Sequence, residues 1–265
     1  MMPPVSGRVD LHNHVLHGID DGPATIEDSL AMGIMAARDG TRVLAATPHV
    51  REDYPGVQPA ELAGRVAALD AQLSERGVDI RIVSGGEVAL VDALERPEAE
   101  LRTVTLGANG RDLLVETPHH GLSPSFEDLL AGVSARGFRV VLAHPEISRE
   151  LQRDPERLGR IAGAGVLVQV TASALGAPRS RAGRLAWRAI GEGWVHVLAS
   201  DAHSPSWRPP TLAVALDAAR AVHPEAAATL EWMVTEAPRA ILAGEPLPPR
   251  PPLELKRRSR WRRLG

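Results

Sequence analysis

The chain has 265 residues, of which 44% are hydrophobic and 24% charged, which is typical of one large globular domain and excludes general disorder. It contains no cysteine, so disulfides, thiolate metal sites and every mechanism with a cysteine nucleophile are excluded. The net charge is −3, but the last ten residues are strongly basic, so residues 1–255 form an acidic body. An acidic body argues against nucleic acid as a partner.

The sequence offers no membrane span and no export signal. No run approaches the roughly 18 apolar residues of a membrane helix. Residues 1–6 lack both the basic region and the apolar region of a signal peptide. We therefore expect a cytoplasmic protein.

Short apolar runs alternate along the chain with longer amphipathic stretches. The apolar runs predict seven strands that are buried on both faces: Arg8–Val15, Arg42–Thr47, Ile80–Ser84, Asp112–Glu116, Arg139–Ala143, Val166–Val170 and Val195–Ser200. The stretches between them predict helices: Thr25–Asp39, Pro59–Arg76, Ser125–Arg136, Pro155–Ala164, Arg181–Glu192, Leu212–Val222 and Pro224–Ala243. This alternation predicts a parallel α/β fold, either a closed or distorted barrel or an open sheet. No strand is followed by Gly-x-Gly-x-x-Gly, which disfavours a dinucleotide-binding sheet.

The C-terminal end differs in composition from the rest of the chain. Residues 245–255 are dense in proline, and we expect an extended segment that leaves the domain before the basic tail. The chain is therefore divided into a domain of residues 1–243 and a C-terminal part of residues 244–265. Two alternatives are open for the basic tail, a solvated end or a contact with an anionic membrane surface.

Residue types that bind metals follow the C-terminal ends of six of the seven predicted strands. In chain order these residues are His12, His14 and Asp21, then His49, Glu87, Glu116 and His144, and finally Asp201 and His203. The sixth strand, which ends near Thr171, offers no strong ligand. Taken one at a time, such residues have simpler explanations, such as a strand-end cap for a histidine or an arginine partner for Glu116.

The C-terminal ends of the strands of a β/α barrel converge on one mouth, so we expect these side chains to face one another. His12 and His14 alternate with Asn13 and therefore point to one side of the first strand. Crowded carboxylates raise each other's pKa unless cations neutralise them. Five imidazoles and four carboxylates suit two or three divalent ions such as manganese, iron or zinc. The lack of thiolate ligands favours an open catalytic site over a structural zinc site.

The segment from Val9 to Pro23 resembles the opening of PHP-domain (polymerase and histidinol phosphatase) proteins. Its part His17-Gly-Ile-Asp-Asp-Gly-Pro23 resembles a narrower group, the manganese-dependent CpsB/YwqE protein-tyrosine phosphatases of bacterial capsule and exopolysaccharide synthesis. The motifs at 46–49, 143–146 and 200–203 continue the resemblance. It implies a distorted (β/α)7 barrel of the PHP type, with a phosphoesterase domain over residues 1–243.

The resemblance also implies roles for individual residues. The implied metal ligands are His12, His14, Asp21, His49, Glu87, Glu116, His144, Asp201 and His203. Glu87 is expected to bridge two ions, with His12, His14 and Asp201 on the first of them. Asp21, His49 and His203 are expected to hold the most exposed ion. Arg208 is expected to hold the phosphate, and with His203 and Asp201 it makes up the expected catalytic set.

The sequence departs from the family pattern at two positions. Ile147 stands where the family usually has an arginine after His-Pro-Glu, and Arg149 is a candidate replacement with a different geometry. His17 stands where the family commonly has proline. For His17 we consider a surface position and, as the alternative, an extra polar contact at the mouth of the barrel.

The implied activity is hydrolysis of a phosphotyrosine protein by a metal-bound hydroxide, with manganese favoured over iron or zinc. The implied protein substrate is a bacterial tyrosine autokinase of polysaccharide synthesis. Two alternatives are open: a PHP phosphoesterase that acts on a small molecule such as histidinol phosphate or a nucleotide, and a non-catalytic metal-binding regulatory domain. The sequence predicts no particular oligomeric state.

Overall fold

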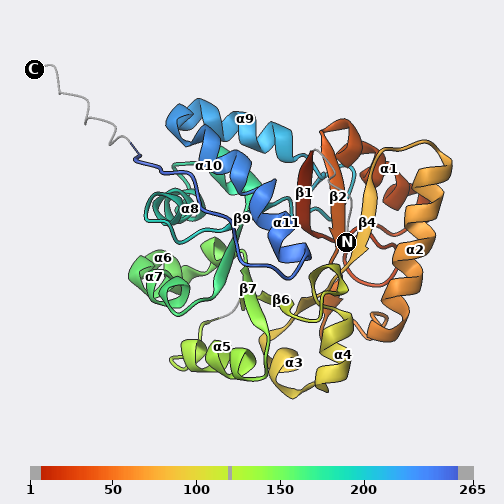
Figure 1. The fold of residues 1–265 in the computed structure, drawn as a ribbon, viewed down its shortest axis with the longest axis horizontal. Helices are drawn as coiled ribbons and strands as arrows, with labels where there is room; N and C mark the ends of the chain where they lie inside the picture. Colours follow the sequence, from red (N-terminus) through yellow and green to blue (C-terminus); the bar gives the residue numbers. More distant parts are fainter. Residues whose placement is uncertain (1–6, 119–120, 256–265) are drawn as a thin grey trace, which may run out of the picture.

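The computed structural model describes residues 7–118 and 121–255, in which strands alternate with helices (Figure 1). The strands are β1 (Arg8–Asn13), β2 (Thr41–Ala46), β3 (His49–Val50), β4 (Arg81–Ser84), β5 (Glu87–Val88), β6 (Asp112–Glu116), β7 (Arg139–Ala143), β8 (Leu167–Thr171) and β9 (Val197–Ala199). All seven strands predicted from the sequence are present. The two-residue strands β3 and β5 were not predicted, because they are too short to produce an apolar run.

Within the described residues the strands form two sheets, with the orders β1-β2-β4 and β3-β5-β6-β7-β8-β9. Every strand pair in both sheets is parallel, so the predicted parallel α/β fold is confirmed. A bridge between Asn13 and Ala202 joins the end of β1 to the chain just after β9. The first sheet therefore meets the second at the C-terminal ends of these strands.

Two short interruptions separate the sheets elsewhere. Thr47 and Pro48 stand between β2 and β3, and Gly85 and Gly86 stand between β4 and β5. The glycines are required by close packing, because a Cβ on Gly86 would lie 2.8 Å from Cγ2 of Val50. After the interruptions, the two segments that form β2 and β4 pair again as β3 and β5.

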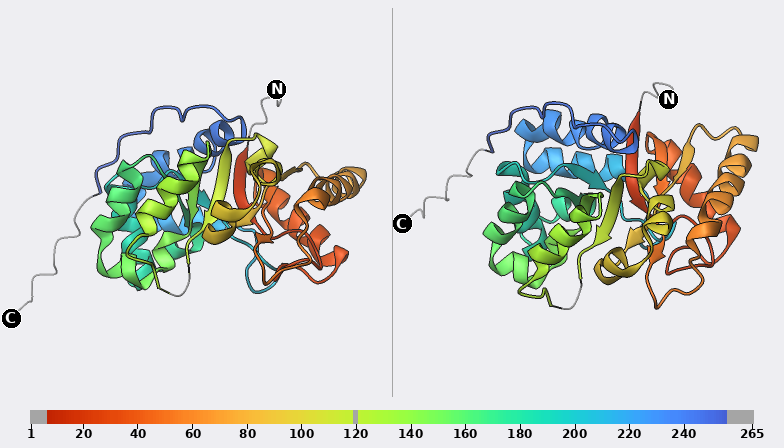
Figure 2. Two further views of the ribbon diagram at one scale, coloured as in Figure 1. Left: turned by 90° about the horizontal axis from the view of Figure 1, so that it is seen from below. Right: turned by 60° about the horizontal axis from the view of Figure 1, so that its bottom comes forward.

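The helices lie on the outside of the strands (Figures 1 and 2). They are α1 (Ile26–Arg38), α2 (Pro59–Glu75), α3 (Leu90–Glu95), α4 (Glu98–Thr103), α5 (Phe126–Ala135), α6 (Arg149–Arg153), α7 (Pro155–Gly163), α8 (Arg181–Gly191), α9 (Leu212–Val222), α10 (Ala227–Trp232) and α11 (Glu236–Leu242). Side-chain caps fix three of the starts: Thr25 accepts a hydrogen bond from the N–H of Asp28, Ser148 from that of Leu151, and Ser180 from that of Gly183. No helix among the described residues is long and apolar enough to cross a membrane.

The prediction of one helix over Pro224–Ala243 is wrong, since α10 and α11 are separated by a turn at residues 233–235. The carbonyl of Met233 accepts a hydrogen bond from the N–H of Leu198 in β9. The carbonyl of Val234 accepts one from the N–H of Val9 in β1. The strands take these two acceptors, so the helix does not continue through them.

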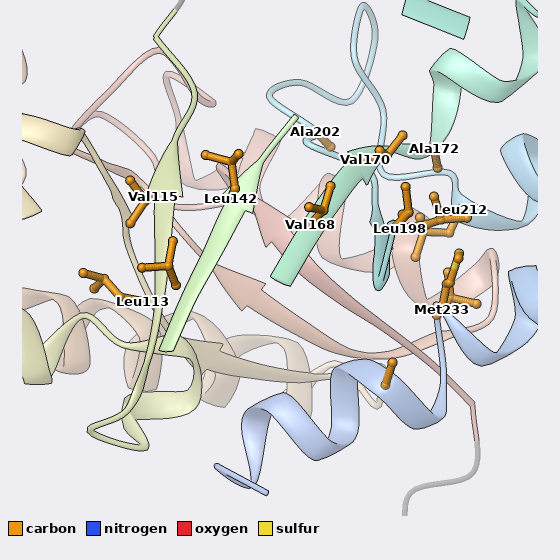
Figure 3. Packing of buried hydrophobic residues seen from close by; sticks show 14 of the residues in the cluster. Leu113, Val115, Leu142, Val168, Val170, Ala172, Leu198, Ala202, Leu212 and Met233 are labelled. Carbon is orange, nitrogen blue, oxygen red and sulfur yellow. The ribbon is translucent and has the colours of Figure 1, made fainter. Parts of the chain in front are cut away.

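The strands are buried on both faces, as predicted. Leu113 and Val115 of β6 belong to the larger hydrophobic core with Leu142 of the neighbouring strand (Figure 3). Leu114 between them belongs to a second hydrophobic cluster, together with residues such as Leu11 of β1. Because neighbouring residues of a strand point to opposite faces, both faces of these strands are covered.

The proline-dense segment does not leave the domain as expected. It runs back across the helices (Figures 1 and 2), and Leu253 and Leu255 pack against the main core. The guanidinium of Arg250 donates a 2.5 Å hydrogen bond to the carbonyl of Ile190 in α8. The segment is extended, and its leucines and Arg250 anchor it to the domain. The predicted basic tail, residues 256–265, lies outside the described residues.

Candidate metal centre

Strand β1 and the residue that follows it supply three buried polar side chains at alternate positions, Asp10 and His12 from the strand and His14 just after its end. The carboxylate of Asp10 accepts hydrogen bonds from the backbone N–H and the hydroxyl of Ser200, at 3.0 and 2.5 Å. The N–H of His14 donates to the carbonyl of Ala202 at 2.8 Å. These bonds hold the first strand against the segment that contains the last predicted ligands.

Both His12 and His14 are oriented by a polar side chain that contacts one of their two ring nitrogens. Nδ1 of His12 lies 2.9 Å from Oε1 of Gln169, and Nδ1 of His14 lies 2.8 Å from Oδ2 of Asp20. Their Nε2 atoms turn inward and lie 3.2 Å apart. A hydrogen bond to the outer nitrogen is the usual way in which proteins fix a metal-binding imidazole.

Glu87 lies at the middle of the cluster. Its register opposite His49 in β3 and β5 brings Oε2 to 3.0 Å from Nδ1 of His49. The same oxygen lies 3.3 Å from Nε2 of His12 and 3.4 Å from Nε2 of His14. Within the described chain, neither this oxygen nor Nδ1 of His49 has a hydrogen-bond partner. A buried carboxylate oxygen surrounded by imidazole nitrogens without hydrogen bonds fits a divalent cation.

Two further ligand candidates stand on strained backbone. His144 follows β7 with φ 38°, and Asp201 follows β9 with φ 52°. The left-handed region costs a residue with a side chain about 1–2 kcal/mol. The conformation brings Nε2 of His144 to 2.7 Å from Oε1 of Glu87 and Oδ1 of Asp201 to 3.4 Å from Nε2 of His12. Strain of this kind concentrates at functional sites.

The structure brings all nine predicted ligands together in four overlapping groups. In each group the candidate ligand atoms lie within 4.8 Å of one another. The groups are His14, Asp21, His49 and His203; His12, His14 and Glu87; His12, His144 and Asp201; and His49, Glu87 and Glu116. The first group is the most accessible, because the side chain of Asp21 is 44% exposed. Glu116 also pairs with Arg51 at 3.0 Å, which is the alternative considered from the sequence.

Protons balance much of the negative charge in the metal-free protein. Burial lowers the pKa of His14, but its hydrogen bond to Asp20 and the nearby negative charges of Asp20 and Glu87 outweigh this effect and raise the pKa to about 10. Burial acts in the same way on His144, and the charge of Glu87 with its hydrogen bond raises that pKa to about 9. Burial alone would raise the pKa of Glu87, but the imidazoles around it hold the pKa well below its usual range. These pKa shifts show that the buried carboxylates of the cluster stabilise positive charge next to them.

Arg208 lies at the edge of this cluster, as the resemblance implies. Its Nη2 donates to Oδ2 of Asp201, and its Nη1 lies 3.4 Å from Nε2 of His203. The side chain is 36% exposed, so its guanidinium is accessible to an incoming anion. Trp207 is 64% exposed and its ring centroid lies 5.9 Å from that of His203. Tyr54 stacks on His49 with centroids 5.1 Å apart.

Two residues that orient candidate ligands, Asp20 and Gln169, were not predicted from the sequence. The sixth predicted strand offers no strong metal ligand, but it contributes to the cluster, because Gln169 of β8 contacts Nδ1 of His12. A glutamine inside the otherwise apolar run 167–170 could have indicated this role, since a buried amide needs a partner. Asp20 also accepts a hydrogen bond from the N–H of His49 at 3.1 Å. From the sequence, only its neighbour Asp21 was predicted to be a ligand.

The two positions that depart from the family pattern, Ile147 and His17, are both at least partly accessible to solvent, and the N–H of Ile147 donates to the carbonyl of the candidate ligand His144 at 3.2 Å. Ile147 is 39% exposed, and Arg149 lines a pocket between α6 and α8. Within the described residues, Arg149 makes no hydrogen bond or ion pair to any of the nine predicted ligands. His17 is half-buried and lines a small pocket beside α2 with Arg65.

Comparison with known proteins agrees with this geometry. Residues 8–243 match the family model described as capsular polysaccharide synthesis, CpsB/CapC. The tyrosine-protein phosphatase YwqE of Bacillus subtilis is 27% identical over 252 residues, covering 95% of this chain and 98% of that protein. The tyrosine-protein phosphatase CpsB of Streptococcus agalactiae is 28% identical over 217 residues, covering 78% of this chain and 87% of that protein.

A solved structure is also similar over nearly the whole chain. It comes from work on YwqE of Bacillus subtilis and CpsB of Streptococcus pneumoniae, described as metal-dependent tyrosine phosphatases. It superposes with a TM-score of 0.81 and 26% identity, covering 94% of this chain and all of the other.

We expect Gln169→Ala to weaken metal binding by roughly 10–100-fold, the usual effect of removing a group that orients a metal-binding histidine. The substitution leaves Nδ1 of His12 buried without its acceptor. Titration calorimetry with manganese measures the affinity. Gln169→Glu keeps an acceptor and should restore much of it, and Gln72→Ala on α2 serves as the control. Unchanged affinity of the Gln169→Ala protein would contradict the role.

Metal binding should also release protons and strengthen as the pH rises. His14 and His144 have pKa values of about 10 and about 9 without metal, so both are protonated at neutral pH and must lose a proton to bind a cation. The logarithm of the affinity should therefore rise with pH up to about 9, with a slope of up to about two. Calorimetry in buffers of different ionisation enthalpy counts the released protons. A pH-independent affinity would show that neither imidazole is a ligand.

Proposed function

The chain belongs to the CpsB/CapC family of capsular polysaccharide synthesis proteins, and from this premise we propose that it is a metal-dependent protein-tyrosine phosphatase. One observation supports this most directly. Nine imidazole and carboxylate side chains from distant parts of the sequence meet in four overlapping groups, beside an accessible arginine. The relatives that match most of the chain are named tyrosine-protein phosphatases.

We infer that two or three divalent ions, with manganese favoured, are held by the nine residues of these groups. Glu87 belongs to two groups and is the candidate bridge, and the group with Asp21 is the candidate exposed site. When bound, divalent ions neutralise phosphate oxygens and lower the pKa of a coordinated water. Gln169 and Asp20 hold the Nδ1 atoms of His12 and His14, so that the Nε2 atoms are directed toward the ions.

Arg208 is the residue that we assign to the phosphate. Its fork is planar and matches two phosphate oxygens at once. Its guanidinium is paired with Asp201, and binding of the substrate would exchange this carboxylate for the phosphate. Hydrolysis then adds water across the P–O bond, and tyrosine leaves as a phenolate with a pKa near 10, a better leaving group than an alkoxide. Trp207 and Tyr54 offer aromatic surface to the phenyl ring at the rim.

We further propose that residues 1–243 form a distorted (β/α)7 barrel of the PHP type. The parallel strands and the bridge between Asn13 and Ala202 support this arrangement. The substrate we propose is a phosphorylated tyrosine kinase of capsule or exopolysaccharide synthesis, reached from the cytoplasm. The names of the relatives connect them to capsule synthesis, and a family member that removes phosphate from tyrosine needs a tyrosine kinase to supply it.

Removal of metal tests the activity. Thorough chelation should abolish hydrolysis of a phosphotyrosine peptide, and manganese should restore it, because no cysteine is present to act in its place. Histidinol phosphate and a nucleotide monophosphate, assayed in parallel, serve as competing substrates. Full activity after chelation, or a higher kcat/KM on either small molecule, would reject the proposal.

Arg208→Ala should lower kcat/KM for a phosphotyrosine peptide by roughly a hundredfold, the scale seen when one charged or polar donor to a reacting group is removed. Arg208→Lys keeps the charge but loses the planar fork, and should recover only part of the activity. Arg81→Ala, an exposed arginine at the start of β4, is the control. Manganese content is measured in each variant, since an Arg208 effect that follows metal loss would contradict a role in binding phosphate.

A further inference from the structure

Five arginines surround one pocket between α6 and α8. The pocket has a volume of about 400 Å³. Its arginines are Arg149 and Arg153 from α6 and Arg181, Arg184 and Arg188 from α8. The other residues that line it, Gln152, Pro155 and Leu185, are uncharged.

The spacing of these arginines makes two facing stripes. Residues four apart lie on one face of a helix, as do residues three and seven apart. Arg149 and Arg153 satisfy the first spacing, and Arg181, Arg184 and Arg188 satisfy the second. Both stripes turn toward the same cavity. Like charges at such spacings are destabilising, so the arrangement is unfavourable unless an anion lies between them.

Partners within the protein relieve little of this repulsion. Arg188 pairs with Glu156, and Arg184 donates to the carbonyl of Arg179. For Arg149, Arg153 and Arg181, the described residues provide no ion pair. The body of the protein is otherwise acidic, so this is a local concentration of positive charge and not a general property of the surface.

The pocket is close to the metal centre. The short 3-10 helix Pro145–Ile147 directly follows the candidate ligand His144, packs against α8 and leads into α6. Arg149 is five residues after His144, so their Cα atoms are at most about 18 Å apart. An extended peptide rises about 3.3 Å per residue. A chain with one residue in the metal centre therefore reaches the pocket with its fifth or sixth neighbour.

We propose that this pocket binds a second anionic residue, a carboxylate or a phosphate, of the same phosphoprotein whose phosphotyrosine enters the metal centre. The inference rests on the proposed function and adds a preference for acidic sequence around the phosphotyrosine. Guanidinium forks pair with both kinds of anion. A recessed pocket between two helices suits an inserted side chain better than a flat bilayer surface.

The experiment removes three of the arginines and varies the substrate. The pocket variant is Arg153→Gln, Arg181→Gln and Arg184→Gln in one manganese-loaded full-length chain. The peptides carry glutamates four to six positions before or after the phosphotyrosine, and their partners carry glutamines there. The unmodified protein should prefer an acidic peptide by roughly tenfold in kcat/KM, mainly through KM, and more weakly at high salt. The pocket variant should lose this preference and hydrolyse 4-nitrophenyl phosphate as before.

A matched control removes the same charge elsewhere. Arg38→Gln, Arg76→Gln and Arg81→Gln change exposed arginines that lie at or shortly before the N-terminal ends of strands, away from the metal centre, and this variant should keep the preference. Equal losses in both variants, or no preference in the unmodified protein, would overturn the inference. So would a pocket variant that keeps its peptide preference but no longer binds vesicles of anionic lipid. Failure of every protein to hydrolyse 4-nitrophenyl phosphate would instead reject the proposed function itself.

Discussion

The need to balance buried negative charge governs the structure around the metal centre. Glu87 is completely buried, and Glu116 and Asp201 are nearly so, and carboxylates are not stable in such surroundings without compensating positive charge. In the metal-free protein the imidazoles supply it, which is why the pKa of His14 and that of His144 are raised. Divalent cations supply the same charge without protons. Protons and divalent cations can therefore both balance the charge of this cluster, and they compete for the same imidazoles.

Backbone geometry serves this balance of charge. The glycines before β5 allow Glu87 to come into register with His49. Left-handed residues at the ends of β7 and β9 turn His144 and Asp201 inward. The contacts of His14 with Asp20 and of His12 with Gln169 determine which ring nitrogen of each histidine faces the centre. Each of these features is local, yet each determines whether a ligand reaches the shared space, and together they explain why ligands from six strand ends can meet there.

The sequence was sufficient to predict the parallel strands and the set of side chains that the structure brings together. It succeeded because buried strands leave long apolar runs and because their ends carried unusual polar residues. It could not predict β3 and β5, whose pairing depends on the close approach of Gly86 to Val50. It also failed for the turn between α10 and α11, where the carbonyls of Met233 and Val234 serve strands that are far away in sequence. The leucines at 253 and 255 were hidden in a proline-dense segment that resembled a linker. Long-range partners decided all three cases.

The bond between His14 and Ala202 has a consequence for synthesis in the cell. It joins residues 188 positions apart, and the candidate ligands Asp201 and His203 are among the last parts of the domain to leave the ribosome. A nascent chain that ends before them holds at most part of the cation-binding set. Acquisition of the full complement of ions must therefore wait until translation of the domain is nearly complete.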